Sequence, residues 1–290
     1  MRHICLPLIP TSDSSTEGRK TSIKFIDKLL SAARSNRSLL CIGLDPDPDL
    51  MPGVSVPDFN KAIIEATSDL VCAYKPNIAF YEALGLDGLN SLLKTVEIVP
   101  PHIPIIGDAK RGDIGNTARM YARALFATFG FDAVTVNPYL GSDSLKPFLE
   151  YGEKGIFVLC RTSNPGSSDF QSLKCSSEGG HHPLYMAVAQ KARTWNKLDN
   201  VGLVVAATYP DELREVRAIC PDMPLLIPGI GTQGGDLTAA ANHGVDSRGE
   251  KAIIVSSRSI IYASRDSDFA EASRRAARQL RDRINELRPS

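Results

Sequence analysis

The sequence lacks an excess of either charge, because 33 lysine and arginine residues balance 33 aspartate and glutamate residues. Proteins that coat nucleic acid or an anionic membrane depend on an excess of basic residues, so we expect neither partner. No run of about 18 apolar residues is present, which excludes a predicted transmembrane helix. The arginine-rich C-terminal segment also carries Asp282 and Glu286, and this mixture predicts a solvated helix face.

Cysteine and histidine motifs for disulfides or metals are also missing. The six cysteines are scattered without a Cys-x-x-Cys pair, and no histidine lies at zinc-finger spacing. These features predict reduced thiols in a cytoplasmic protein without a metal site. Pro7 and Pro10 interrupt the apolar patch near the N-terminus, and the basic residues before it are few, which is poor for a signal peptide. We expect residues 1–22 to form a disordered or loosely attached extension.

What the sequence does contain is a regular alternation of short apolar runs with amphipathic segments. The first amphipathic segment starts at Ile23. Near-continuous apolar runs are typical of strands buried on both faces of a parallel sheet. Their mean spacing of about 30 residues is that of one strand–helix unit. Eight units predict an α/β fold, a single-domain (β/α)₈ TIM barrel over residues 23–290, with a doubly wound open sheet as the alternative. The runs begin at residues 39, 73, 103, 133, 155, 201, 225 and 251.

One connection, between the runs that start at 155 and 201, is longer than the others and contains a Ser/Gly-rich stretch of about 20 residues. It leaves the C-terminal end of a predicted strand, where barrels carry their active sites. This placement predicts a lid, and a flexible insertion is the alternative. His181 and His182 lie in this stretch without carboxylates at ligand spacing, so we expect them to be solvated.

Charged residues end three successive predicted strands. Side chains two apart on a strand point the same way, so Asp108 and Lys110 share one side, where Asp45 and Lys75 can join them. Buried charges are costly unless paired, which predicts a Lys–Asp network at the barrel mouth, with a purely structural ion-pair network as the alternative. Beside carboxylates, Lys110 keeps its charged form and can donate a proton to a carbon that gains negative charge. Asp108 would repel a substrate carboxylate, and loss of CO₂ would remove that repulsion.

A second group of residues points to a phosphate. The glycine-rich stretch 227–236 follows the seventh predicted strand, and Arg258 follows the eighth. Backbone N–H groups of such a turn can hold an anion, and an arginine can bind it through two nitrogens. Barrels often bind phosphate between these two loops, although an ordinary tight turn would also explain the glycines.

Several segments together carry a resemblance to a known family. In order along residues 23–265, they are GLDPDPDLMP, YKPNIAFYEALG, GDAKRGDIGNTA, VNPYLGSDSLKPF, LCRTSNPGS, LVVAATYP, IPGIGTQGGD and SSRSIIYA. The chain resembles the orotidine 5′-phosphate decarboxylase family, in particular its bacterial members with longer chains. The resemblance implies a cofactor-free carboxy-lyase that converts orotidine 5′-phosphate (OMP) to UMP and CO₂ in de novo pyrimidine biosynthesis.

The resemblance also implies roles for individual residues. Lys110 would protonate C6 of the pyrimidine and Asp108 would face the substrate carboxylate. Lys75 would belong to the charged network and, with Asp45, contact ribose hydroxyls. The family further implies a homodimer in which Asp113 and Thr117 reach the neighbouring subunit's site. The remaining implied contacts are Ser163 for the pyrimidine, and Gln233, Gly234 and Arg258 for the phosphate.

Ser257 departs from the family pattern, because many relatives have glycine beside the arginine that corresponds to Arg258. Two other functions remain as alternatives. One is a Mg²⁺-dependent sugar-phosphate decarboxylase or aldolase of the same barrel superfamily. The other is a catalytically inactive barrel that binds a phosphate ligand. The presence of Asp108, Lys110 and Asp113 argues against this alternative.

Overall fold

The structure, a computed structural model, describes residues 23–177, 180–231 and 234–289, so the extension predicted over residues 1–22 lies outside the described residues. Eight parallel strands form its centre, and they coincide with the predicted runs; the largest shift is in the third, which begins at Ile106 rather than 103. All of these strands except the third and the fifth are buried along their whole length, which is why most of their sequences are nearly continuously apolar. The strands are β1 (Leu40–Leu44), β2 (Ala73–Pro76), β3 (Ile106–Arg111), β4 (Ala133–Val136), β5 (Gly155–Arg161), β8 (Val201–Val205), β9 (Leu225–Ile227) and β10 (Ala252–Ser256).

The strands close into a barrel. Their order is β2-β1-β10-β9-β8-β5-β4-β3, and the two end strands meet through parallel bridges that pair Tyr74 with Ile105 and Asn77 with Asp108. The Tyr74 N–H also donates to the Pro104 carbonyl at 3.1 Å. The prediction of a (β/α)₈ barrel is therefore confirmed, and the open-sheet alternative is wrong.

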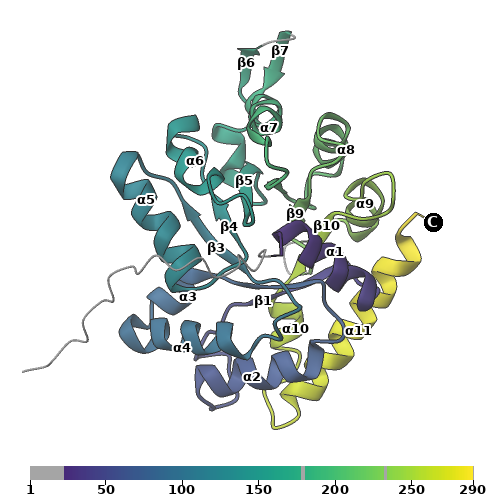
Figure 1. Cartoon of the computed structure of the whole chain (residues 1–290). Coiled ribbons are helices and arrows are strands. Elements are labelled where there is room, and N and C mark those ends of the chain that lie inside the picture. The colour runs from purple at the N-terminus through teal and green to yellow at the C-terminus, as the bar shows by residue number, and fades with distance from the viewer. Residues whose placement is uncertain (1–22, 178–179, 232–233, 290) are drawn as a thin grey trace, which may run out of the picture.

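Helices surround the barrel and cover the outer faces of the strands (Figure 1). Four shorter elements follow individual strands or helices: α3 (Ile78–Glu82), the π-helical turn η1 (Ala124–Thr128), the 3₁₀ turn η2 (Pro165–Asp169) and α10 (Arg258–Ile261). The longer helices are α2 (Val56–Thr67), α4 (Gly85–Ile98), α5 (Gly115–Arg123), α6 (Ser142–Leu149), α7 (Leu184–Trp195), α8 (Pro210–Ile219), α9 (Leu237–His243) and α11 (Phe269–Leu287).

The first helix, α1 (Phe25–Ser35), closes the N-terminal end of the barrel. In Figure 1 it lies across the centre of the ring. Phe25 and Leu29 belong to the apolar cluster inside the barrel, and the Phe25 ring packs edge-on against Phe157 at 5.7 Å between centroids. Ile23, where the predicted amphipathic segment starts, precedes the helix and is exposed. Since α1 fills one end, a ligand has access to the barrel interior from the C-terminal mouth.

The long β5–α7 connection is more ordered than its composition predicts. It contains η2 and an antiparallel hairpin of β6 (Lys174–Ser177) and β7 (Gly180–Pro183). Figure 1 shows this hairpin projecting outward past α7, away from the barrel centre. Among the described residues of this connection, those that line the cavity at the barrel mouth precede the hairpin: residues 162–164 and Gln171. We call residues 162–171 the wall segment.

The arginines of α11 lie on the helix surface and pair with acidic residues. Arg274 contacts Asp69 at 2.5 Å, and Arg283 contacts Glu286 at 2.7 Å. Among the described residues, no helix combines the length and apolar character needed to cross a bilayer.

Candidate active site

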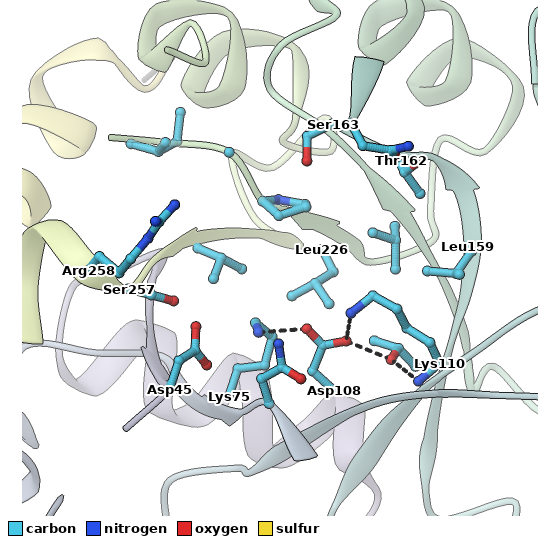
Figure 2. A pocket seen from close by; sticks show the side chains of 18 of the residues that line it. Asp45, Lys75, Asp108, Lys110, Leu159, Thr162, Ser163, Leu226, Ser257 and Arg258 are labelled. Carbon is cyan, nitrogen blue, oxygen red and sulfur yellow. Dashed lines mark hydrogen bonds and ion pairs between the residues drawn. The ribbon is translucent and has the colours of Figure 1, made fainter. Parts of the chain in front are cut away.

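Three charged side chains from β2 and β3 form an ion-paired group at the C-terminal mouth, which we call the charged array. The Lys75 ammonium lies 2.8 Å from Asp108 Oδ2, and the Lys110 ammonium lies 2.6 Å from Asp108 Oδ1. Figure 2 shows the Asp108 carboxylate held between the two ammonium groups. The side chains of Lys75 and Asp108 are 6% and 12% exposed, whereas that of Lys110 is 49% exposed. Lys110 is therefore the member of the array that a ligand can reach most easily.

The array remains charged at neutral pH because each buried group has a partner of opposite sign. Burial alone would lower the pKa of Lys75, but the carboxylates of Asp108 and Asp45 more than reverse this effect and hold it above its ordinary value. Burial alone would raise the pKa of Asp108, but the ammonium groups of Lys75 and Lys110 outweigh it and hold the pKa well below its ordinary value. A substrate therefore meets a fixed anion flanked by two fixed cations.

Thr135 on β4 completes the array, although sequence reasoning did not single it out. Its hydroxyl donates to Asp108 Oδ1 at 2.9 Å and accepts the backbone N–H of Lys110 at 2.9 Å. This contact holds Lys110 at a φ of +48°, in the left-handed region that costs a non-glycine residue roughly 1–2 kcal/mol. The β3–β4 register shifts at the same point. The signal that could have indicated Thr135 is a lone hydroxyl in an apolar strand.

Asp45, directly after β1, lies beside the array without a hydrogen bond to it. Its Oδ1 is buried and has no hydrogen-bond partner among the described residues. Figure 2 shows its carboxylate near Lys75. A buried acceptor without a partner is costly, and a ligand hydroxyl would satisfy it. Asp45 is therefore suited to accept a hydrogen bond from a sugar.

The charged array lines a cavity of about 520 Å³ that also contains Arg258, at the start of α10. This volume lies in the range of small-molecule sites. Figure 2 shows Lys110 and Thr162 toward one side of the cavity and Arg258 toward the other. Apolar side chains form another part of the lining, and apolar surroundings strengthen the electrostatic interactions of the charged groups. The apolar side chains are Leu159, Val204, Leu226, Pro228, Ile230 and Val255.

Not every predicted site residue faces this cavity. Ser163 lines it, but Asp113, Thr117 and Gly234 are absent from its lining. The Asp113 carboxylate instead accepts the N–H of Ile114 at 2.8 Å, and Thr117 is exposed on α5. Gly234 has a φ of +71°, and its N–H donates to the Gly231 carbonyl at 3.0 Å. Gln233 lies outside the described residues.

Ser257, the departure from the family pattern, packs against β1. A Cβ atom on Gly43 would lie 1.7 Å from Ser257 Oγ and 2.8 Å from Ser257 Cβ, so a side chain at position 43 would collide with it. Ser257 lines the cavity, and Figure 2 shows it between Arg258 and Asp45. The serine thus fits here because a glycine faces it from the neighbouring strand.

The described residues do not gather three or more histidine, cysteine, aspartate or glutamate side chains in a possible metal site. The carboxylates in the cavity are Asp45 and Asp108, and Asp108 already has two ammonium partners. His181 lies in the β6–β7 hairpin with its Nδ1 3.2 Å from Ser176 Oγ. Three cationic side chains, those of Lys75, Lys110 and Arg258, line the cavity, and their charge suits an anionic ligand.

Comparisons with known proteins agree with this geometry. The model of the orotidine 5′-phosphate decarboxylase / HUMPS family matches residues 38–274. The chain is 54% identical over 267 residues to the orotidine 5′-phosphate decarboxylase of Dehalococcoides mccartyi, covering 92% of this chain and 99% of that one. It is 52% identical over 275 residues to the protein of the same name from Thermomicrobium roseum, covering 92% and 96%.

Solved structures give the same result. The OMP decarboxylase of Leishmania donovani matches with a TM-score of 0.81 and 41% identity, covering 91% of this chain and 98% of that one. The UMP synthase of the same organism matches with a TM-score of 0.83 and 42% identity, and this chain spans 56% of its length. The family inferred from the sequence segments is thus confirmed, and the chain belongs to the orotidine 5′-phosphate decarboxylase / HUMPS family.

Proposed function

We propose that this protein is an OMP decarboxylase that forms UMP and CO₂ in pyrimidine biosynthesis and uses Lys110 as its proton donor. The observation that carries the proposal is the Lys75–Asp108–Lys110 array in a cavity that also contains Arg258. The family match and the names of the relatives support the same activity. With the pyrimidine at the array, the ammonium groups would stabilise the carbanion that the reaction creates.

The substrate is oriented by its phosphate and ribose. Arg258 binds the phosphate, with Gln233 and Gly234 as further contacts. The Asp45 carboxylate accepts a hydrogen bond from a ribose hydroxyl, and the Lys75 ammonium donates one to a ribose hydroxyl. Ser163 contacts the pyrimidine ring. These contacts lie away from the reacting carbon, so their binding energy holds the ring in position for reaction.

The chemical step needs one bond broken and one formed. The bond between C6 and the carboxylate breaks, CO₂ leaves, and the electron pair stays on C6. The Lys110 ammonium then transfers a proton to C6, and the resulting neutral amine regains a proton from solvent. Asp108 repels the substrate carboxylate before CO₂ leaves, and it holds Lys110 in place at 2.6 Å.

This activity is tested by following the absorbance of OMP in the presence of the purified protein. We expect turnover that persists after treatment with EDTA, because the proposed chemistry uses Lys110 and no metal ion. Loss of turnover with EDTA, restored by Mg²⁺, would favour the Mg²⁺-dependent sugar-phosphate decarboxylase or aldolase instead.

The protein is also proposed to act as a homodimer whose sites are shared. Asp113 and Thr117 lie outside the cavity of their own chain. Large apolar side chains are exposed on the loop before α5, on α5 itself and on the β4–α6 loop. A second copy would cover this surface and receive Asp113 and Thr117 at its own cavity. The exposed apolar residues are Ile114, Met120, Tyr139 and Leu140.

A mixture of two inactive variants tests the shared site. Lys110→Ala and Asp113→Ala subunits should regain activity together, because one site of each mixed dimer has an intact Lys110 and an intact Asp113. Random exchange makes half of the dimers mixed, with one complete site in two, so we expect about a quarter of wild-type turnover. If exchange is verified by mass spectrometry and no turnover returns, Asp113 does not cross the interface.

A cytoplasmic location is part of the same proposal. Five cysteines in the described part of the chain are free thiols, and four of these are buried. Reduced thiols are usual in the cytoplasm, where pyrimidine biosynthesis would require the enzyme.

A further inference from the structure

A buried cation beside the cavity has no part in the mechanism above. Arg161, the last residue of β5, has a side chain that is only 3% exposed, although it does not line the cavity. Burying a guanidinium is costly unless it has partners, and its Nε has none among the described residues. The other contacts of Arg161 must therefore stabilise its buried charge.

Those contacts join two separate segments of the chain. On one side, Nη1 donates to Ser167 Oγ at 2.6 Å and lies 3.5 Å from Gln171 Oε1. On the other side, the guanidinium carbon lies 3.6 Å from the centroid of the Tyr209 ring, and Nη2 lies 3.6 Å from Glu212 Oε1. Arg161 thus holds the wall segment to the β8–α8 region, which is itself fixed to the barrel.

Hydrogen bonds within the wall segment connect the residues that Arg161 contacts to the residues that line the cavity. Gln171 Oε1 accepts the N–H of Thr162 at 2.9 Å, and Gln171 Nε2 donates to Thr162 Oγ1 at 2.8 Å. Thr162 Oγ1 in turn donates to Asn164 Oδ1 at 2.7 Å. Thr162, Ser163, Asn164 and Gln171 all line the cavity. Ser163 therefore lies between two residues, Thr162 and Asn164, whose hydrogen bonds lead through Gln171 to Arg161.

We propose that Arg161 is a positioning residue for recognition of the base: it touches no substrate, but it holds the wall segment where Ser163 and its neighbours meet the pyrimidine. This inference rests on the proposed function, because it takes the cavity to be a nucleotide site. The planar guanidinium is required for two reasons. The guanidinium lies over the Tyr209 ring while one of its N–H groups donates to Ser167, and a lysine ammonium cannot make both contacts at once.

The test compares two ligands that differ only in the base. UMP carries phosphate, ribose and pyrimidine, whereas ribose 5-phosphate lacks the pyrimidine. In Arg161→Met we expect the dissociation constant of UMP, measured by calorimetry, to rise about tenfold, the effect of losing one well-placed hydrogen bond. The constant for ribose 5-phosphate should stay within about twofold, because the contacts of Arg258 and Asp45 do not depend on Arg161. The value of kcat for OMP should fall together with UMP affinity.

Two further variants separate positioning from general stability. Ser167→Ala removes the 2.6 Å contact with Arg161 and the 3.3 Å contact with the Tyr209 hydroxyl but leaves the guanidinium over the Tyr209 ring. It should shift the UMP constant in the same direction by less and keep the fold. Arg217→Met is the matched control, because Arg217 is another largely buried arginine that donates to the carbonyls of Met223 and Gly244, away from the cavity. It should lower the melting temperature without changing the ratio of the two constants.

An unchanged UMP to ribose 5-phosphate ratio in Arg161→Met and Ser167→Ala would overturn the proposal. So would an equal change of that ratio in Arg217→Met. Turnover of OMP by the wild-type protein tests the proposed function separately, since it does not depend on these ratios.

Discussion

Replacing Lys110 with alanine is expected to lower kcat/KM for OMP by at least about a thousandfold, because the variant loses both the proton donor and the cation that stabilises the carbanion. Decarboxylation is measured by the loss of OMP absorbance. The fold should survive, since the Lys110 side chain is half exposed and Asp108 keeps its contacts with Lys75 and Thr135.

Lys110→Gly makes this prediction sharper. Position 110 has a φ of +48°, which glycine adopts without strain, so this variant should unfold at the same or a higher urea concentration than Lys110→Ala. Both variants should nevertheless be inactive. Lys154→Ala is the matched control, because Lys154 contacts the Phe131 carbonyl outside the cavity. Near-normal turnover in either Lys110 variant would contradict the assignment of the proton donor.

Asp108→Asn should have the second large effect and should change both activity and stability. The amide has nearly the shape of the carboxylate but no charge, so Lys110 loses the anion that positions it. Lys75 becomes a buried cation without its closest anionic partner. We expect turnover to fall by at least about a thousandfold. Breaking a buried ion pair on one side should lower the free energy of unfolding by about 3–5 kcal/mol, as measured by urea denaturation.

The charge state of Lys75 gives a second measurement on the same variant. Burial lowers the pKa of Lys75, and the Asp108 carboxylate is the largest influence that raises it. Without that carboxylate the pKa of Lys75 should therefore fall, which NMR of a labelled lysine can follow. The control is Asp132→Asn, since Asp132 pairs with Lys28 at 2.8 Å near the opposite end of the barrel. That variant should lose stability yet keep its turnover, and an inactive Asp132→Asn would show that ion-pair loss alone explains the effect.

The sequence predicts the strands of this fold well for a physical reason. A strand buried on both faces must be apolar at successive positions, so the runs that start at residues 39, 133 and 201 could be recognised without any partner. Closure of the barrel is different. It depends on two isolated bridges between β2 and β3, and no local pattern encodes them.

The same distinction holds in the site. Asp108 and Lys110 are found from the alternation of a strand, which is a local property. Thr135 contacts Asp108, which is distant in sequence, and Arg161 contacts Ser167 in an irregular turn and the distant Glu212. A threonine or an arginine at these positions therefore does not by itself indicate a role. The β6–β7 hairpin was missed because its polar sequence lacks the apolar alternation by which a half-buried strand is recognised.

A crystal structure of the protein with UMP bound would test directly whether Lys110 lies where it can protonate the pyrimidine. We expect C6 of the pyrimidine within about 3.5 Å of the Lys110 ammonium, the phosphate at Arg258, and a ribose hydroxyl on Asp45. A nucleotide bound in the reverse direction, with its phosphate at Lys110 and its base at Arg258, would rule out Lys110 as the proton donor.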